Sequence, residues 1–144
     1  MDILIDANII LDVLFQRAPF YEKSLQIVQI CIKGHATGFI SAHSVTTMWY
    51  LLRHEFSPEE RRKMFKIVFS WCRIASVGHS ELLSALDRDD FPDFEDCVQD
   101  ECAESVHARY IITRNKKDFA RSKIPALLPA EFIDIMELRE RVRV

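Results

Sequence analysis

The chain has 144 residues, of which 49% are hydrophobic and 28% charged, a composition typical of a globular protein rather than a disordered one. No apolar run approaches the roughly 20 residues of a membrane span, and no secretory signal is recognisable. We therefore expect a cytoplasmic protein with no membrane partner. The net charge of −3 gives no support for nucleic-acid binding and does not exclude it, because binding surfaces are local.

Short apolar runs alternate along the chain with segments of helical periodicity. Residues 3–5 have the pattern of a buried strand, and the apolar positions after Asp6 fall at helical intervals. At residues 57–60, the sequence SPEE favours a helix start, with a serine cap and the glutamate of a capping box. In chain order, the expected elements are a strand at 2–6, helices at 8–15 and 19–33, a strand at 36–41, helices at 42–54 and 58–71, a strand at 73–77, helices at 80–87 and 93–107, and a strand at 110–113.

The last part of the chain turns through two prolines, and EFIDIM at 131–136 resembles a final edge strand. We expect residues 137–144 to be a mobile tail, either a further edge strand or an arm that a partner orders. Because strands alternate with helices, the predicted fold class is α/β, a three-layer sandwich with helices on both faces of a mainly parallel sheet of about four or five strands. No repeat or linker is visible, so residues 1–144 are predicted to form a single domain.

Asp6 lies where the first apolar strand ends and the first helix begins. Ligands of open α/β sheets bind at this edge of the sheet, so Asp6 is a candidate binding residue. Aspartate is also a common helix cap. On this stretch alone, both interpretations stay open.

A second acidic segment, DRDDFPDFEDCVQDE at 87–101, holds eight carboxylates and one base, Arg88. Crowded carboxylates raise one another's pKa unless a cation or a helix N-terminus offsets the repulsion. The helix dipole contributes only about 0.3–1 kcal/mol per charge. Asp93, Asp96 and Asp100 are three and four residues apart and share one helix face. The alternative interpretation is an acidic face exposed to solvent.

A third segment, YIITRNKKDF at 110–119, also places polar residues and an acid directly after an apolar strand. The alternative is an ordinary loop, since Asn and Asp favour turns. Because the ends of parallel strands meet at one edge of the sheet, the three segments could deliver carboxylates to one pocket. Magnesium takes one or two carboxylates and keeps several waters, and paired metal ions promote phosphodiester cleavage.

Four motifs make the chain resemble the PIN-domain (PilT N-terminus) family over nearly its whole length. They are DANIILD at 6–12, ISAHSVTTMWYLL at 40–52, DFEDCVQ at 93–99 and IITRNKKDF at 111–119. The resemblance implies a parallel sheet flanked by helices and an endoribonuclease that depends on Mg2+ or Mn2+. The small single-domain form resembles the VapC-type toxins of bacterial toxin–antitoxin pairs, which implies RNA as the substrate, an antitoxin protein as a partner and a homodimer.

By motif position, the resemblance implies that Asp6, Asp96 and Asp118 bind metal. Asp93 is a further catalytic acid, and Asp96 or Asp93 would help to deprotonate the attacking water. The polar positions that support the pocket are Asn8, Thr47, Thr113 and Asn115. The flanking basic residues Arg114, Lys116 and Lys117 are candidates for binding RNA phosphates, or else ordinary solvated loop charges.

Thr47 departs from the family pattern, which usually has glutamate at this position of the third helix. Threonine removes one negative charge and one strong metal ligand. Glu55 cannot replace it, because eight residues span roughly 12 Å along a helix. The alternative function is therefore a catalytically reduced PIN-fold module that binds RNA or a partner protein. A phosphatase with an aspartate nucleophile is disfavoured, because Asn8 stands where such enzymes carry a second acid.

Cysteine and histidine spacing gives no indication of a structural zinc site. The five histidines share no spacing and are predicted to be surface or cap residues rather than ligands; His43 is the best exception, because it lies next to the third-helix motif. The four cysteines form no C-x-x-C pair and are predicted to be reduced core residues. They are Cys31, Cys72, Cys97 and Cys102.

Overall fold

The computed structural model describes residues 1–143. Its centre is a five-stranded sheet in the order β3-β2-β1-β4-β5, and every neighbouring pair of strands is parallel. The strands are β1 (Asp2–Ile5), β2 (Thr37–Ser41), β3 (Cys72–Ala75), β4 (Tyr110–Ile112) and β5 (Ala126–Leu127). The helices are α1 (Ala7–Leu14), α2 (Tyr21–Ile32), α3 (Ala42–Leu51), α4 (Pro58–Trp71), α5 (His79–Leu86), α6 (Phe94–Ser105) and α7 (Pro129–Arg143). The predicted α/β fold class is confirmed.

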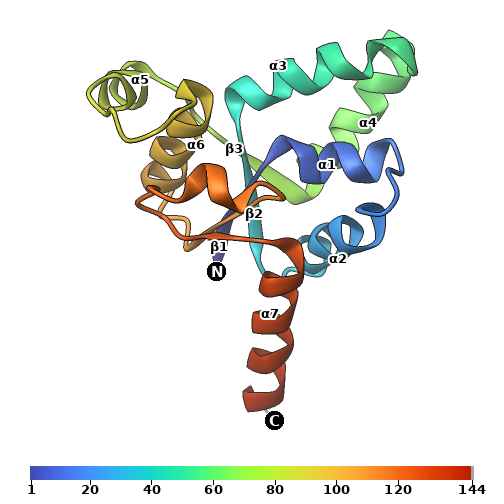
Figure 1. Ribbon diagram of the computed structural model, residues 1–144. Helices are drawn as coiled ribbons and strands as arrows, with labels where there is room; N and C mark the ends of the chain where they lie inside the picture. The colour runs from blue at the N-terminus through green and yellow to red at the C-terminus, as the bar shows by residue number, and fades with distance from the viewer. Residues whose placement is uncertain (144) are drawn as a thin grey trace.

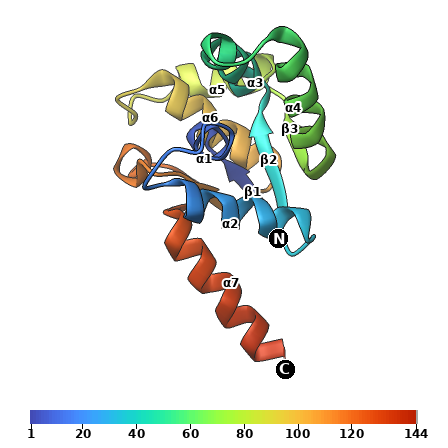
Figure 2. The ribbon, with the colours of Figure 1, turned by 90° about the vertical axis from the view of Figure 1, so that its right-hand side faces the viewer.

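Helices cover both faces of the sheet, so the molecule has three layers. Figure 1 shows α5 and α6 on one side of the sheet, α1, α2 and α4 on the other, and α7 extending away from the body. Alternate residues of β1 enter different cores: Ile3 and Ile5 pack with residues of α1, α2, α4 and α7, whereas Leu4 packs with residues of α5 and α6. Figure 2 shows the same arrangement from the side, with α3 and α4 at the end opposite α7.

The start of α4 forms as the sequence predicts. The Ser57 hydroxyl accepts a hydrogen bond from the Glu60 N–H at 3.1 Å, and the Glu60 carboxylate accepts one from the Ser57 N–H at the same distance. This reciprocal capping box, with Pro58 in the first turn, satisfies N–H groups that have no partner inside the helix.

The prediction of a last strand at 131–136 is wrong, because these residues belong to α7. Pro129 begins this helix, and the Glu131 carboxylate accepts the Leu128 N–H at 2.9 Å. The buried residues Phe132, Ile133 and Met136 follow helical spacing and pack on the sheet. The fifth strand is instead β5. It has only two residues, too few to show the alternation of apolar and polar residues that predicts a strand. An edge strand at 137–144 is also wrong for residues 137–143, which continue α7, and Val144 lies outside the described residues.

Strand register places a row of residues along the carboxyl edge of the sheet. Leu4 of β1 pairs with Phe39 of β2, and Ile5 pairs with Ile112 of β4. When both registers are continued past the strand ends, Asp6 stands between Ser41 and Thr113. Residues two apart on a strand face the same side, so these three side chains share the face of Leu4, which α6 covers.

All four cysteines are free and buried, as predicted. Burial raises the pKa of the Cys31, Cys72 and Cys102 thiols to about 12, and burial also raises the pKa of the Cys97 thiol. These thiols are therefore packing groups rather than nucleophiles.

Within residues 1–143, none of the helices combines the length and the apolar character that crossing a membrane requires.

Candidate active site

Asp6 follows β1 directly and occupies the cap position of α1. Its carboxylate makes no regular capping bond, and its Oδ2 accepts a hydrogen bond of 2.8 Å from the Thr113 hydroxyl. Burial raises the pKa of Asp6, while the Thr113 bond, the nearby N–H groups of Asn8 and Ala7, and the positive charge of Arg114 each lower it. The carboxylate is thus held at the sheet edge by a residue from another strand.

The loop after β4 turns around the Thr113 side chain, which is fully buried. The Thr113 hydroxyl accepts the Asn115 N–H at 3.0 Å, so its own hydrogen is directed to Asp6. The carbonyl of Asn115 accepts the Asp118 N–H at 2.9 Å, which fixes the short 3-10 helix at Lys116–Phe119. Asn115 therefore shapes the loop through its backbone, and Asp118 is exposed at its end.

Asp93 and Asp96 stand at the start of α6. The Asp93 side chain caps the helix by accepting the Asp96 N–H at 3.1 Å. The carboxylate of Asp96 is half-buried in the first turn. Helix α6 therefore presents two acids with its positive dipole end behind them.

The charges of three separate segments act on Asp96. Its pKa is raised to about 7, first by burial and then by the negative charges of Asp93, Asp6, Asp118 and Glu95. Such repulsion falls off steeply with distance, so these carboxylates share one region of the surface. The structure thus brings together the four acids that the sequence selected, and the main charges that raise the pKa of Asp96 are those of neighbouring carboxylates.

The donor set is suited to a hard divalent cation. Within residues 1–143, no three His, Cys, Asp or Glu side chains converge tightly enough to form a complete ligand set. Magnesium does not need one, because it takes one or two carboxylates and keeps most of its waters. The carboxylate oxygens of Asp6 and Asp96, with Asp118 in the same region, have the chemistry that a hydrated Mg2+ or Mn2+ prefers.

Arg114 is held inside the protein by Asp12, an acid with no exposed surface. The Arg114 Nη2 donates to Asp12 at 3.1 Å, and the guanidinium stacks on the Phe20 ring, 3.9 Å from its centroid. Asp12 also accepts a hydrogen bond from Ser24 at 3.1 Å. Arg114 therefore links the loop after β4 to α1 and α2, a positioning role that the sequence interpretation did not include.

The other predicted basic residues are exposed on the same loop. Lys116 forms an ion pair with Glu131 of α7 at 2.9 Å, whereas Lys117 points to solvent without an ion pair among residues 1–143. Of the three predicted basic residues, Lys117 is thus the one without an ion pair among residues 1–143.

Thr47 lies on the exposed surface of α3, and its hydroxyl donates to the His43 carbonyl at 3.2 Å. His43 has its Nε2 3.7 Å from the Glu95 carboxylate, and burial lowers the pKa of the imidazole. His43 therefore joins the start of α3 to the start of α6, beside the acids.

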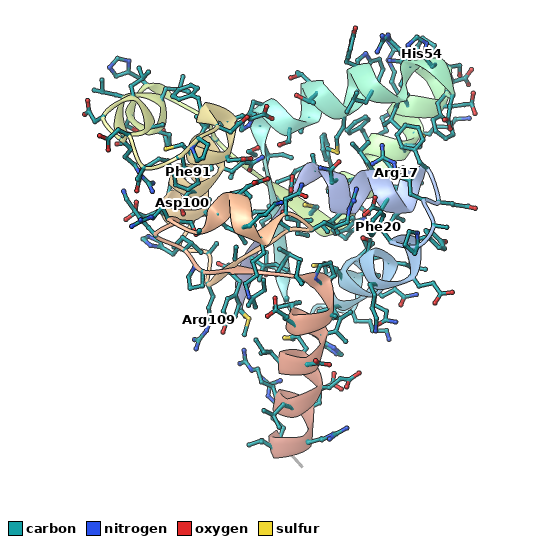
Figure 3. The ribbon with its side chains drawn as sticks, viewed as in Figure 1. Arg17, Phe20, His54, Phe91, Asp100 and Arg109 are labelled. Carbon is teal, nitrogen blue, oxygen red and sulfur yellow. The ribbon has the colours of Figure 1, made fainter. Side chains whose placement is uncertain are left out.

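Asp100 shared a predicted face with Asp93 and Asp96, but it is fully buried in a separate ion pair. Its Oδ2 accepts from Arg88 at 2.7 Å, and both its oxygens accept backbone N–H groups, from Lys123 and Ile124. Figure 3 shows Phe91 and Asp100 on the side of α5 and α6, away from Arg17 and Phe20 near the ends of α1 and α2. The structural ion pairs of Asp12 and Asp100 thus lie on two sides of the site.

The sequence interpretation missed two groups of buried polar residues around the acids. The first is Asp12 with Ser24, and its signal was a single acid inside the apolar run of α1. The second group comprises Ser41, Ser44 and Gln99. The strand-end position of Ser41 and the spacing of Gln99 three residues after Asp96 could have indicated it.

The family model of the PIN domain matches residues 2–117. Because this match spans most of the chain, the chain belongs to the PIN-domain family. The match includes the first three motifs named above and most of the fourth, and it ends one residue before Asp118. A search of curated proteins gave no match.

Several solved structures have a similar fold. VapBC2 from Rickettsia felis, bound to a DNA fragment from its promoter, is 18% identical with a TM-score of 0.64, over 89% of this chain and 98% of that chain. A toxin–antitoxin complex from Klebsiella pneumoniae is 18% identical with a TM-score of 0.67, over 88% and 96%. The sarcin–ricin loop cleaving toxin VapC20 of Mycobacterium tuberculosis is 14% identical with a TM-score of 0.59, over 76% and 86%. At these identities, the likeness establishes the fold.

Proposed function

We propose that the protein is an endoribonuclease that depends on Mg2+ or Mn2+ and is the toxin of a toxin–antitoxin pair. The observation that carries this proposal is the set of neighbouring carboxylates at the carboxyl edge of the sheet, where the charges of Asp6, Asp93 and Asp118 raise the pKa of Asp96. Membership of the PIN-domain family and the likeness to toxin structures, one of which is named for cleaving the sarcin–ricin loop, support it.

In this proposal, Asp6, Asp96 and Asp118 hold the cation. When bound, the cation lowers the pKa of water and neutralises negative charge on the scissile phosphate. Asp96 or Asp93 accepts the proton of the attacking water. Thr113 keeps Asp6 oriented through its 2.8 Å hydrogen bond, and Lys117 supplies a positive charge for a neighbouring phosphate of the RNA.

Substitution of Asp6 by asparagine tests the mechanism. Asp6→Asn keeps the shape of the side chain and removes its charge, so we expect cleavage of RNA with Mn2+ to fall at least 100-fold, roughly the effect of losing a main electrostatic group. Asp2→Asn, at the other end of β1, is the matched control and should cleave like the wild type. Gel-resolved cleavage, with and without EDTA, measures both. Undiminished cleavage by Asp6→Asn would remove the mechanism.

A second candidate function is a PIN-fold module that binds RNA or a partner protein without efficient catalysis. Thr47, which gives the third helix a neutral hydroxyl bonded to its own backbone, favours it. Thr47→Glu distinguishes the two functions. If the variant gains Mn2+ affinity and cleavage where the wild type has neither, the binding module is the native function.

An antitoxin protein and a second copy of the chain are the proposed protein partners. An apolar groove between α1, α2 and α4 suits the apolar face of a partner helix. Its lining residues are Ile10, Val13, Leu14, Val28, Ile32, Met64, Ile67, Val68 and Trp71. The proposal predicts that the neighbouring gene encodes a small protein that binds this chain and blocks cleavage.

A further inference from the structure

Three neutral polar side chains form a buried cluster between α3 and α6, which we call the hydroxyl–amide cluster. Ser41, Ser44 and Gln99 are 0%, 1% and 4% exposed. The Ser41 and Ser44 hydroxyl oxygens are 2.7 Å apart, and the Gln99 Nε2 donates to the Ser44 hydroxyl at 2.9 Å. The cluster therefore joins the end of β2 to the second turn of α6.

The hydroxyl–amide cluster borders the acids. Ser41 stands next to Asp6 in the row along the sheet edge, on an adjacent strand about 4.8 Å away and on the face that α6 covers. Gln99 lies three residues after Asp96, on the same side of α6, and helical side chains lean toward the N-terminal end of their helix. Gln99 thus extends toward the turn that carries Asp96.

The amide oxygen of Gln99 has no partner. Gln99 Oε1 is buried and accepts no hydrogen bond from any residue in 1–143. The amide nitrogen is used by Ser44, and Ser41 and Ser44 share a hydrogen bond with each other. A buried acceptor without a donor calls for an ion, a water or a catalytic role, since such groups are rare in native proteins.

Thr47, the α3 residue considered above as a supporting polar group, is poorly placed to supply an oxygen ligand. Thr47 is exposed, and its hydroxyl is bonded to the His43 carbonyl on its own helix. Amide oxygens are good ligands for Mg2+ and Mn2+, because these cations prefer carboxylate, carbonyl and water oxygens. The unpartnered Gln99 Oε1 has this chemistry and no competing contact.

We propose that Gln99 supplies a neutral oxygen ligand, through Oε1, to the divalent cation that Asp6 and Asp96 bind. This inference rests on the proposed function. It places the neutral oxygen ligand of the cation on α6, because Thr47 of α3 does not provide one. Ser41 and Ser44 are positioning residues, because the hydrogen bond from the Gln99 amide nitrogen to the Ser44 hydroxyl fixes the amide and leaves its oxygen without a protein partner.

The test is a calorimetric titration with Mn2+ alone, so that its readout does not depend on RNA cleavage. Gln99→Leu removes the oxygen and should weaken Mn2+ binding about 10- to 100-fold. Gln99→Glu keeps the shape and adds a charge, so it should bind Mn2+ more tightly than the wild type. Gln29→Leu, on the exposed surface of α2, is the matched control and should bind like the wild type.

The outcomes separate this inference from the proposed function. Equal Mn2+ affinity of wild type and Gln99→Leu overturns the inference and leaves the nuclease proposal standing, whereas a wild type that binds no Mn2+ overturns both. Circular dichroism checks the fold. If Gln99→Leu does not fold, Gln99→Met takes its place, since it keeps the length of the side chain and removes the amide oxygen; equal Mn2+ affinity of this variant and the wild type overturns the inference.

Discussion

Aspartates of this chain differ in function according to whether a base accompanies them. Asp12 and Asp100 are fully buried, and each forms an ion pair with an arginine. Asp96 is only half-buried, yet the main charges that act on its pKa are those of four neighbouring carboxylates. The acids paired with arginine stabilise the fold, whereas the negative charge of Asp96 is disfavoured by its neighbours.

Asp96→Asn should make the protein less sensitive to pH. The pKa of Asp96 rises from 3.8 to about 7 on folding, so the folded state binds this proton more tightly than the unfolded state does. Stability from this group is therefore present below about pH 4 and is lost as the pH rises to 7. In EDTA, we expect the variant to have a higher melting temperature than the wild type at pH 8 and an equal one at pH 4.

Thermal melts over this pH range measure the difference. Asp134→Asn, on the exposed surface of α7, serves as the control and should follow the wild-type curve. Addition of Mg2+ at pH 8 should raise the melting temperature of the wild type more than that of Asp96→Asn. Parallel curves for wild type and Asp96→Asn would contradict the unfavourable charge of this carboxylate.

Helices and strands with a clear periodicity could be predicted from the sequence. Very short elements, and contacts between residues far apart in the chain, could not. The strand before Asp6 and the capped start of α4 came from local patterns, which fix local structure. The last strand was misread because Phe132, Ile133 and Met136 can be taken for either period in so short a run. Asp100 was grouped with Asp96 by helical spacing, whereas its arginine partner lies twelve residues earlier in the chain.

The candidate acids could be selected from the sequence because strand ends in a parallel sheet meet at one edge. The contacts among the buried polar residues around them could not be predicted. Ser44 and Gln99, for example, are 55 residues apart, and no local pattern indicates that their side chains touch. Tertiary packing alone creates this contact.

Asp12 connects three elements, and its removal should destabilise the protein strongly. Asp12→Ala breaks the contacts with Arg114 and Ser24 and leaves a guanidinium that is largely buried without its counter-charge. We expect a loss of about 3 kcal/mol in the free energy of unfolding, at the lower end for a buried pair because Arg114 keeps some exposure. Urea denaturation measures it.

Ser24→Ala is the control for this prediction, because it removes one hydrogen bond to Asp12 and leaves the ion pair in place. We expect it to cost about 1 kcal/mol. If the free energy of unfolding falls by the same small amount in both variants, the contact between Asp12 and Arg114 does not hold α1 to the loop after β4.

At the scale of the whole molecule, large apolar side chains on α2 and α4 are exposed to water in the single chain. Ile32 and Ile67 are 59% and 65% exposed on neighbouring helices, and Phe69 is 45% exposed on α4. Exposed apolar patches on soluble proteins commonly mark interfaces. This surface supports the proposed partners, a second copy of the chain or an antitoxin.

Sedimentation equilibrium should therefore give a mass of twice 16.8 kDa for the isolated protein at micromolar concentration. Dilution is the internal control, because a specific dimer dissociates to the single-chain mass without forming larger species. A single-chain mass at every concentration would leave only the antitoxin as the proposed protein partner.

The four free thiols in the core make the native protein chemically silent toward alkylating reagents. Reaction needs a thiolate in contact with solvent, and these sulfurs have neither ionisation at neutral pH nor access to water. The rate of maleimide labelling would accordingly report how often the protein unfolds and exposes a cysteine, because no cysteine reacts in the folded state. The native cysteines therefore allow the unfolding rate to be measured without an engineered probe.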